Sequence, residues 1–101
     1  MPTRHTLGPT SDIPENGCRT YDLDANDVTV YNIGGRFYAV SSRCPHAGTD
    51  LSRGTLSDGV VTCPGHGLRF NLATGACLDR DDFSLTRLAI ELDNGILYVT
   101  F

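Results

Sequence analysis

Two short segments of the chain each place a cysteine close to a histidine. They read Cys44-Pro45-His46 and Cys63-Pro64-Gly65-His66. Thiolate sulfur and imidazole nitrogen are common metal ligands in proteins. The alternative is two buried cysteines with two surface histidines near turns, but two separate pairs at ligand spacing favour a metal site. The sequence therefore predicts that these four side chains bind a metal centre.

The way the ligands are paired bears on which metal they bind. A zinc finger ordinarily takes its two cysteines from one segment and its two histidines from another. Here each segment supplies one cysteine and one histidine. This mixed pairing suits a two-iron cluster in which each segment gives one ligand to each iron. Zinc is the alternative that the spacing leaves open.

The residues around the ligand segments predict a scaffold of antiparallel β-strands. Residues 28–33 and 36–40 flank Gly34-Gly35, and Asn94-Gly95 divides residues 92–101 in the same way, so both read as hairpins. Residues 1–17 suit a short edge strand followed by a loop. Residues 44–75 hold six glycines and two prolines around a short strand at residues 60–62. The fold class expected is all-β, with two glycine-rich ligand loops inserted in the scaffold.

Residues 76–94 are ambiguous, because they lack glycine and proline and fit two periods. Leu85, Leu88, Ala89 and Leu92 lie on one face of a helix, whereas Leu88, Ile90 and Leu92 alternate as in a strand. The Asn-Gly turn directly after them favours the strand.

Length and composition limit the class of protein. A chain of 101 residues is expected to form one domain, residues 1–101. The net charge is −4, with eight arginines and no lysine, which argues against nucleic-acid binding. No apolar run approaches the ~20 residues of a membrane span, and the N-terminal residues do not read as a secretory signal. We therefore expect a cytoplasmic protein without a membrane partner, and a reducing compartment disfavours a disulfide between Cys18 and Cys77.

The ligand segments and their surroundings resemble the Rieske [2Fe–2S] domain. The residues that carry the resemblance are Cys44-Pro45-His46-Ala47-Gly48, Leu51-Ser52-Arg53-Gly54, Cys63-Pro64-Gly65-His66-Gly67, Phe70 and Thr74-Gly75. The resemblance implies the Rieske fold of stacked antiparallel sheets, with a cluster-binding part at about residues 41–76. It also implies one [2Fe–2S] cluster, with Cys44 and Cys63 on the inner iron and His46 and His66 on the outer iron.

The reduction potential expected for such a cluster is at the low end of the family's range. Histidine ligation gives a more neutral cluster, which raises the potential to roughly −150 to +300 mV, against about −400 mV for plant-type clusters. High-potential respiratory members add a disulfide between the cluster loops and a serine that donates to a cluster sulfur. In this chain Gly65 and Leu68 stand at the second-loop cysteine and serine positions. Fewer hydrogen bonds to sulfur stabilise the reduced cluster less.

The number of histidines separates a carrier from an oxygenase. Ring-hydroxylating oxygenases hold a catalytic iron with two histidines and a carboxylate. The chain has three histidines, and only His5 is left once His46 and His66 are assigned to the cluster. We therefore expect no catalytic residues in this chain. The resemblance implies a separate ferredoxin, which passes electrons from a flavoprotein reductase to the terminal oxygenase of an aromatic-ring dioxygenase system.

The partners are expected to bind transiently at the cluster tip of a monomer. One alternative is a non-catalytic Rieske subunit of a nitrite-reductase-like or other oxidoreductase complex, and another is a zinc-binding interaction module.

The chain departs from the family in one respect. The family usually shields its cluster with a third loop that contains proline, but residues 77–84 contain none. Phe83 is the candidate replacement.

Overall fold

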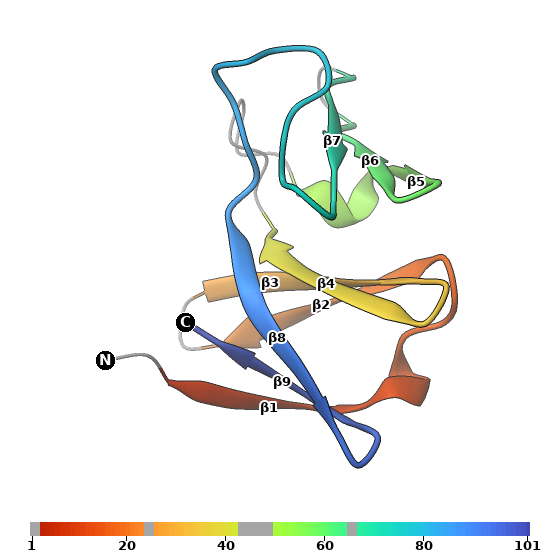
Figure 1. The fold of residues 1–101 in the computed structure, drawn as a ribbon, viewed down its shortest axis with the longest axis vertical. Helices are drawn as coiled ribbons and strands as arrows, with labels where there is room; N and C mark the ends of the chain where they lie inside the picture. The colour runs from red at the N-terminus through yellow and green to blue at the C-terminus, as the bar shows by residue number, and fades with distance from the viewer. Residues whose placement is uncertain (1–2, 24–25, 43–49, 65–66) are drawn as a thin grey trace.

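The computed structural model describes residues 3–23, 26–42, 50–64 and 67–101, and these residues form two antiparallel sheets (Figure 1). The larger sheet has the strand order β1-β9-β8-β4-β3-β2. The smaller sheet has the order β5-β6-β7 and lies at the top of Figure 1. The strands are β1 (Arg4–Pro9), β2 (Gly17–Leu23), β3 (Asn26–Ile33), β4 (Arg36–Ser41), β5 (Thr55–Ser57), β6 (Val60–Thr62), β7 (Arg69–Asn71), β8 (Arg87–Asp93) and β9 (Ile96–Thr100). Two 3-10 helices, η1 (Thr10–Asp12) and η2 (Leu51–Arg53), complete the elements of the described residues.

Both hairpins expected from the sequence are present. Gly34 and Gly35 join β3 to β4 with φ angles of 59° and 88°, and Ile33 pairs with Arg36. Asn94 and Gly95 join β8 to β9 with φ angles of 51° and 78°. Two successive positive φ angles match the right-handed twist of the flanking strands, which is why glycine and asparagine occupy these turns.

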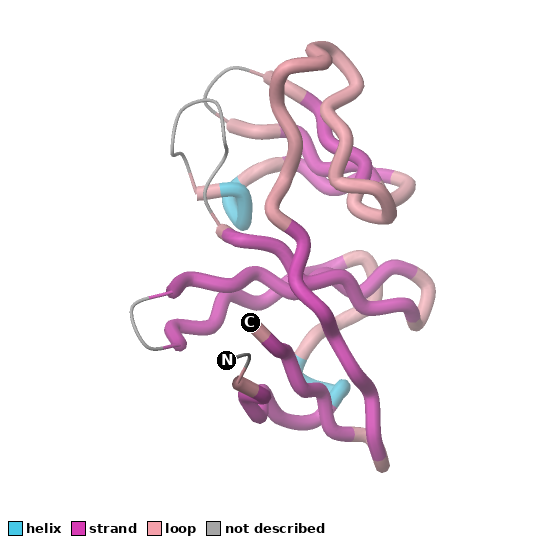
Figure 2. Tube along the Cα trace, turned by 60° about the vertical axis from the view of Figure 1, so that its left-hand side comes forward, coloured by secondary structure: helices cyan, strands magenta, loops and turns pink. Residues whose placement is uncertain are grey.

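The larger sheet curls into two layers because β8 changes partner along its length. It pairs with β4 at Leu88 and Arg87 and with β9 from Ala89 to Asp93. Figure 2 shows β2, β3 and β4 as one layer, with β1 and β9 in the other. Apolar side chains fill the space between the layers: Ile13, Val28, Val30, Ala39, Leu97 and Val99 are buried there. The predicted edge strand is β1, which has only β9 as a neighbour.

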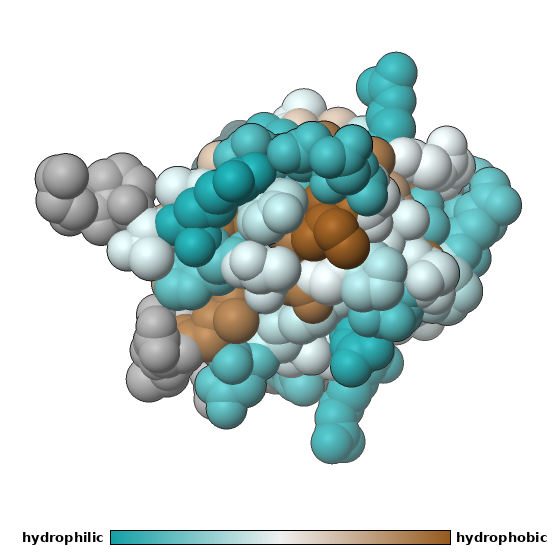
Figure 3. Space-filling model, turned by 90° about the horizontal axis from the view of Figure 1, so that it is seen from below, coloured by the Kyte–Doolittle hydropathy of each residue, from teal (hydrophilic) through white to brown (hydrophobic). Residues whose placement is uncertain are grey.

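The divergence of β4 from β8 also opens a groove at the end of the scaffold away from the smaller sheet. The groove has a volume of about 340 Å³, and Phe37, Ile90 and Leu92 contribute to its lining. Figure 3, which views the molecule from below, shows apolar side chains at this end surrounded by polar ones.

The layer formed by β2, β3 and β4 separates two cores. Residues of β3 alternate between them: Val28 and Val30 face the scaffold core, whereas Tyr31 faces the smaller sheet. The second core contains Tyr31, Val40, Leu51, Val61, Cys63, Phe70, Leu72, Cys77 and Leu85. This core attaches residues 50–86 to the scaffold, so the expected insertion of a separate part in a β scaffold is confirmed.

Residues 76–94 are irregular first and then extended. Isolated bridges join Phe70 to Cys77 and Ala76 to Ser84, and β8 begins at Arg87. The strand prediction is confirmed for the second half of the segment, and the helical alternative is wrong. Within the described residues, no helix has the length and apolar character needed to cross a membrane.

Candidate metal centre

Of the four predicted ligands, Cys63 lies within the described residues, whereas Cys44, His46 and His66 lie outside them. Cys63 follows directly after β6, and only 1% of this residue is exposed to solvent. Its thiol is free and belongs to the core beneath the smaller sheet. Burial on a rigid strand end fixes the position of this sulfur.

A tight turn follows Cys63. The backbone N–H of Gly67 donates to the carbonyl oxygen of Cys63 at 3.0 Å, and the N–H of Cys63 donates to the carbonyl of Leu68 at 2.8 Å. Gly67 has a φ of 71°, which a residue with a β-carbon rarely adopts. These bonds bring the two ends of the second ligand segment together, with His66 in the sequence between them.

The first ligand segment is closed at its base in a similar way. The N–H of Leu51 donates to the carbonyl of Ser42 at 2.7 Å, so the residues on either side of 43–49 are in contact. The N–H of Ser42 donates to the carbonyl of Asp27 at 3.0 Å, and the Ser42 hydroxyl lies 2.7 Å from that of buried Thr29. All three polar groups of Ser42 are therefore bonded, which anchors the start of the segment to β3.

The end of the first segment is anchored by Asp50. Its carboxylate accepts from the N–H of Ser52 at 3.0 Å and from the Ser52 hydroxyl at 2.7 Å, which caps η2. Beneath η2 lies the Cys18 thiol, whose Sγ is 3.9 Å from the Ser52 carbonyl oxygen. Burial, and secondarily the charge of Asp50, raises the pKa of the Cys18 thiol. Cys18 is thus held in its protonated, neutral form.

The other cysteines show no disulfide. Cys18 and Cys77 are both free. Across the described residues, no group of three or more histidine, cysteine, aspartate or glutamate side chains is arranged to hold a metal ion.

An ion pair joins β7, the strand that follows the second ligand segment, to the chain that follows Cys77. Arg69 Nη2 donates to Asp79 Oδ1 at 2.7 Å, and Arg69 Nε donates to Oδ2 at 3.2 Å. The backbone N–H of Arg69 also donates to Oδ2, at 2.9 Å. These hydrogen bonds, the side-chain one foremost, lower the pKa of Asp79, so this carboxyl stays ionised well into the acid range.

The described surroundings fit an iron–sulfur cluster. Cys63 offers a free, buried sulfur, and both ligand segments have their ends joined by backbone hydrogen bonds. A sulfur ligand must be available as a thiolate, and this thiol is not used by a disulfide. An all-β scaffold with an inserted three-stranded sheet, and with two such segments after β4 and after β6, defines a Rieske-type protein.

The chain belongs to the Rieske [2Fe–2S] domain family, whose model matches residues 3–87. A Rieske-type [2Fe–2S] cluster is accordingly its cofactor. The ferredoxin subunit of 3-phenylpropionate/cinnamic acid dioxygenase from Escherichia coli is 34% identical over 94 residues, which cover 90% of this chain and 87% of that protein. Human apoptosis-inducing factor 3 is 38% identical over 90 residues, which cover 84% of this chain but only 14% of that protein.

A solved structure shares the fold over nearly the whole chain. It is the complex of reduced oxygenase and oxidized ferredoxin in carbazole 1,9a-dioxygenase, and its matching chain is 32% identical with a TM-score of 0.87. The match covers 95% of this chain and 91% of that chain. The all-β Rieske fold predicted from the sequence is therefore confirmed. The four individual ligands stay a prediction.

Proposed function

We propose that this chain is a low-potential Rieske ferredoxin, which carries single electrons from a flavoprotein reductase to the terminal oxygenase of an aromatic-ring-hydroxylating system. The observation that carries the proposal is the likeness to the E. coli dioxygenase ferredoxin subunit, which extends over most of both chains. The matching chain in the carbazole dioxygenase complex supports a terminal oxygenase as the electron acceptor.

The four predicted ligands would be shared between the two irons of the cluster. Cys63 and Cys44 would bind the inner iron, and His46 and His66 the outer iron. When bound, such a cluster takes up and releases one electron. The core around Cys63 would keep water from the inner side of the cluster. Backbone hydrogen bonds join the described residues that flank both ligand segments.

The remaining histidine supports a carrier without a catalytic iron. His5 lies on β1, and its ring stacks on Phe101 with 4.4 Å between the ring centroids. This strand lies at the bottom of Figure 1, away from the smaller sheet. A site with two histidines and one carboxylate needs more histidines than this sequence has left.

The low potential is supported by the residue at the usual serine position. Leu68 offers an apolar side chain there, and it packs against the core that contains Cys63. It has no hydroxyl to donate to a cluster sulfur, so the reduced state is stabilised less. We further propose that residues 1–101 act as one domain, as a cytoplasmic monomer that binds reductase and oxygenase in turn.

A redox titration followed by EPR tests the function. We expect a rhombic [2Fe–2S] signal and a potential near the lower limit of the Rieske range, about −150 mV, unchanged around neutral pH. A potential well above zero that falls with pH near neutrality would instead indicate a respiratory type. Zinc without an EPR signal would refute electron transfer.

Alanine substitutions test the ligand set. We expect Cys44→Ala, His46→Ala, Cys63→Ala and His66→Ala each to abolish the Rieske signal. Cys18→Ala and His5→Ala are the matched controls and should keep it.

Gel filtration of the protein, alone and with a candidate oxygenase, tests the oligomeric state. Stable co-purification with a large subunit would favour the alternative of a fixed subunit in an enzyme complex.

A further inference from the structure

Strands β4 and β8 pair with each other over a short stretch and then separate toward the turn between β3 and β4. Ala39 pairs with Leu88 and Val40 pairs with Arg87, and no further pair joins these two strands in the part of the chain that the structure describes. The groove of about 340 Å³ is lined by residues of both strands beyond this pairing. Its walls are therefore strand edges.

The β4 wall directs backbone hydrogen-bonding groups into the groove. In an antiparallel sheet, successive residues of a strand direct their N–H and C=O groups to opposite sides. Ser41 donates its N–H to the carbonyl of Thr86 at 2.9 Å, which is the β8 side of β4. Phe37 precedes Ser41 by an even number of residues, so its backbone groups also point to the β8 side.

The β8 wall does the same from the opposite side. Asp93 and Ile96 close the two-residue turn between β8 and β9, and such a closing pair shares its hydrogen bonds. Ile90 and Leu92 precede Asp93 by an odd number of residues, so their N–H and C=O groups point away from β9 and toward β4. An unpaired edge of this kind is a template for another strand.

The side chains that line the groove are mostly apolar. Phe37 and Ile90 pack against the scaffold core, and Leu97 in the lining is fully buried. Leu92 continues the apolar face of β8 beyond that core and is 55% exposed. An apolar side chain that enters the groove would remove Leu92 from water, which is favourable.

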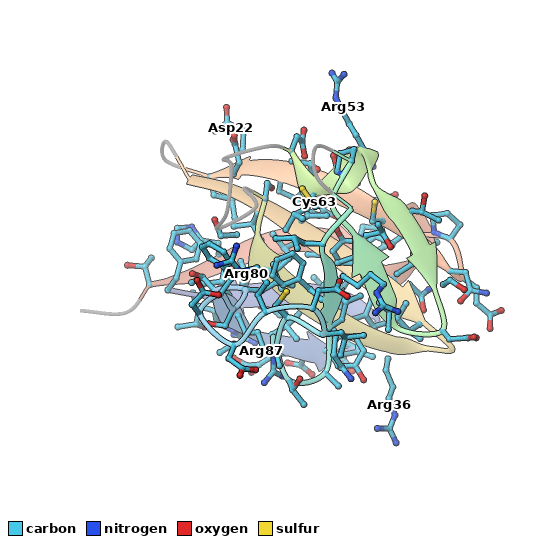
Figure 4. The ribbon with its side chains drawn as sticks, turned by 90° about the horizontal axis from the view of Figure 1, so that it is seen from above. Asp22, Arg36, Arg53, Cys63, Arg80 and Arg87 are labelled. Carbon is cyan, nitrogen blue, oxygen red and sulfur yellow. The ribbon has the colours of Figure 1, made fainter. Side chains whose placement is uncertain are left out.

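One charge at the groove has no partner among the described residues. Arg36 contributes to the lining, and Figure 4 shows its side chain pointing away from the ribbon. The ion pairs of the described residues do not include Arg36. Glu91, which also lines the groove, is paired with Arg4 at 3.5 Å. The charge left to attract a ligand is therefore positive, although the chain has a net charge of −4.

We propose that this groove is a docking site for an extended segment of a partner protein, which adds a strand to the edge of β8. The segment carries apolar side chains at alternate positions and an acidic side chain that pairs with Arg36. In strand addition, backbone hydrogen bonds supply affinity and the contacts of alternate side chains supply specificity. A second copy of this chain is less suitable, because two chains of net charge −4 repel each other. A small ligand would leave the backbone groups of Ile90 and Leu92 without a partner.

The groove lies at the end of the scaffold away from the smaller sheet (Figure 1). Under the proposed function, electrons are exchanged near the ligand segments that adjoin the smaller sheet. A partner held in the groove would therefore not compete with electron exchange. Docking itself depends only on the scaffold strands, so it succeeds or fails independently of the proposed function.

The test titrates the purified, cluster-loaded and isotope-labelled protein with a blocked peptide, acetyl-Thr-Val-Asp-Ile-Thr-Val-amide, and follows the amide NMR signals. We expect the signals of Phe37, Ile90 and Leu92 to shift. A second peptide carries methyl groups on its backbone nitrogens, so it cannot donate to a strand edge, and it should not bind. A third peptide has lysine in place of aspartate and should bind more weakly than the first.

Substitutions on the protein test the two side-chain contacts. Leu92→Ser should weaken binding of the aspartate peptide about tenfold. Arg36→Glu should reverse the preference, so that the lysine peptide binds more tightly than the aspartate peptide. Leu78→Ser and Arg53→Glu are the matched controls, since Leu78 is also an exposed leucine and Arg53 is an exposed arginine on η2. Both controls should bind the aspartate peptide as the parent protein does.

Absence of any shift at Phe37, Ile90 and Leu92 would overturn the proposal. Equal affinity for the methylated peptide would overturn it too, because the groove would then bind apolar groups without adding a strand. Sedimentation of the protein without peptide provides the remaining outcome: a dimer that Leu92→Ser dissociates would show that a second copy occupies the groove and would also overturn the proposal. A failure of the proposed function is distinct, since the parent protein would then lack the Rieske EPR signal.

Discussion

The three cysteines that the structure describes have different surroundings and different chemistry. Cys63 lies at the end of β6 in the turn that leads to His66. Cys18 lies on β2 under η2, where burial and Asp50 raise its thiol pKa. Cys77 is a buried core residue bridged to Phe70 through the backbone. Position in the fold, rather than residue type, therefore separates the candidate ligand from the two structural cysteines.

Tyr31 provides a prediction about stability. Its hydroxyl is buried and has no hydrogen-bond partner in the described part of the chain. A buried polar group without a partner costs free energy, so we expect Tyr31→Phe to increase the free energy of unfolding by about 1 kcal/mol or more. Urea unfolding of the loaded protein measures this change. Tyr38→Phe, at a partly buried position on the same core, is the control and should not give the increase.

The same tyrosine predicts a loss of stability in alkali. Burial, followed by the effects of Cys18 and Asp50, raises the pKa of Tyr31 above its ordinary value of about 10. The folded state thus favours the neutral phenol. Its contribution is complete below the unfolded pKa and is lost as the pH rises through the folded pKa.

Urea unfolding between about pH 8 and pH 11 tests this dependence. The unfolding free energy should fall less steeply with pH in Tyr31→Phe than in the parent protein. Equal slopes in the two proteins would contradict the assignment to Tyr31.

Gly54 is predicted to be irreplaceable because of a close backbone approach. An added β-carbon would collide with the carbonyl oxygen of Thr62, at the point where η2 passes β6. Backbone atoms cannot move aside cheaply, so we expect Gly54→Ala to cost about 1–3 kcal/mol of unfolding free energy or more. Gly59→Ala is the control: its β-carbon meets nothing, although its φ of 76° carries a smaller strain of about 1 kcal/mol.

At the scale of elements, the ligand segments depend on strands that precede and follow them. β4 ends at Ser41, and the bonded Ser42 starts the first segment. β6 ends at Thr62, directly before Cys63, and β7 begins at Arg69, directly after Leu68. Each segment therefore begins and ends next to residues that strands or backbone hydrogen bonds hold in place.

The segment that follows β7 provides an acid-dependent prediction. Pairing with Arg69 lowers the pKa of Asp79, so the pair stabilises the fold above the unfolded carboxyl pKa of about 3.9. This stabilisation is lost as the pH falls through the folded pKa. We expect the difference in thermal midpoint between the parent protein and Asp79→Asn to shrink as the pH is lowered from about 6 to 3.

Asp81→Asn is the matched control for this experiment, because Asp81 lies in the same segment. Its difference from the parent protein should not follow the titration of Asp79. A difference for Asp79→Asn that is constant with pH would show that the ion pair contributes nothing to stability.

At the scale of the whole molecule, two cores share one layer of strands. The scaffold core lies between β2-β3-β4 and β1-β9-β8, and the second core joins the smaller sheet to the other face of β2-β3-β4. The strands of the smaller sheet are three residues long, whereas those of the scaffold have five to eight residues. The smaller sheet thus has few backbone bonds of its own, and the core that it shares with the scaffold supports it.

Removal of the iron should therefore loosen one part of the molecule and leave the other folded. Metal binding is coupled to the folding of the residues that supply the ligands. After chelation, we expect amide hydrogen exchange to accelerate in β5, β6 and β7, while β3 and β9 stay protected. Exchange followed by mass spectrometry measures both regions in one experiment, and equal loss of protection in both would contradict this division.

Local signals in the sequence accounted for much of the scaffold. Gly34-Gly35 and Asn94-Gly95 predicted two hairpins because their turns need positive φ angles that few other residues adopt. The Asn-Gly turn also settled the strand at Arg87–Asp93, where helical and strand periods coincide. β2 was not predicted, because its residues alternate between exposed and half-buried positions and give little apolar contrast.

The class of site could be predicted from the amino-acid sequence, since two cysteine–histidine pairs within glycine-rich segments are a local pattern of ligand types and spacing. The groups that surround these segments became known from the folded structure. Cys18 lies beneath Ser52, and Asp79 binds Arg69 across a turn of the chain. Such contacts depend on how strands pair and layers pack, and pairing between distant residues leaves no periodic signal along the chain. The metal chemistry is therefore local in origin, whereas its control by neighbouring residues is a property of the fold.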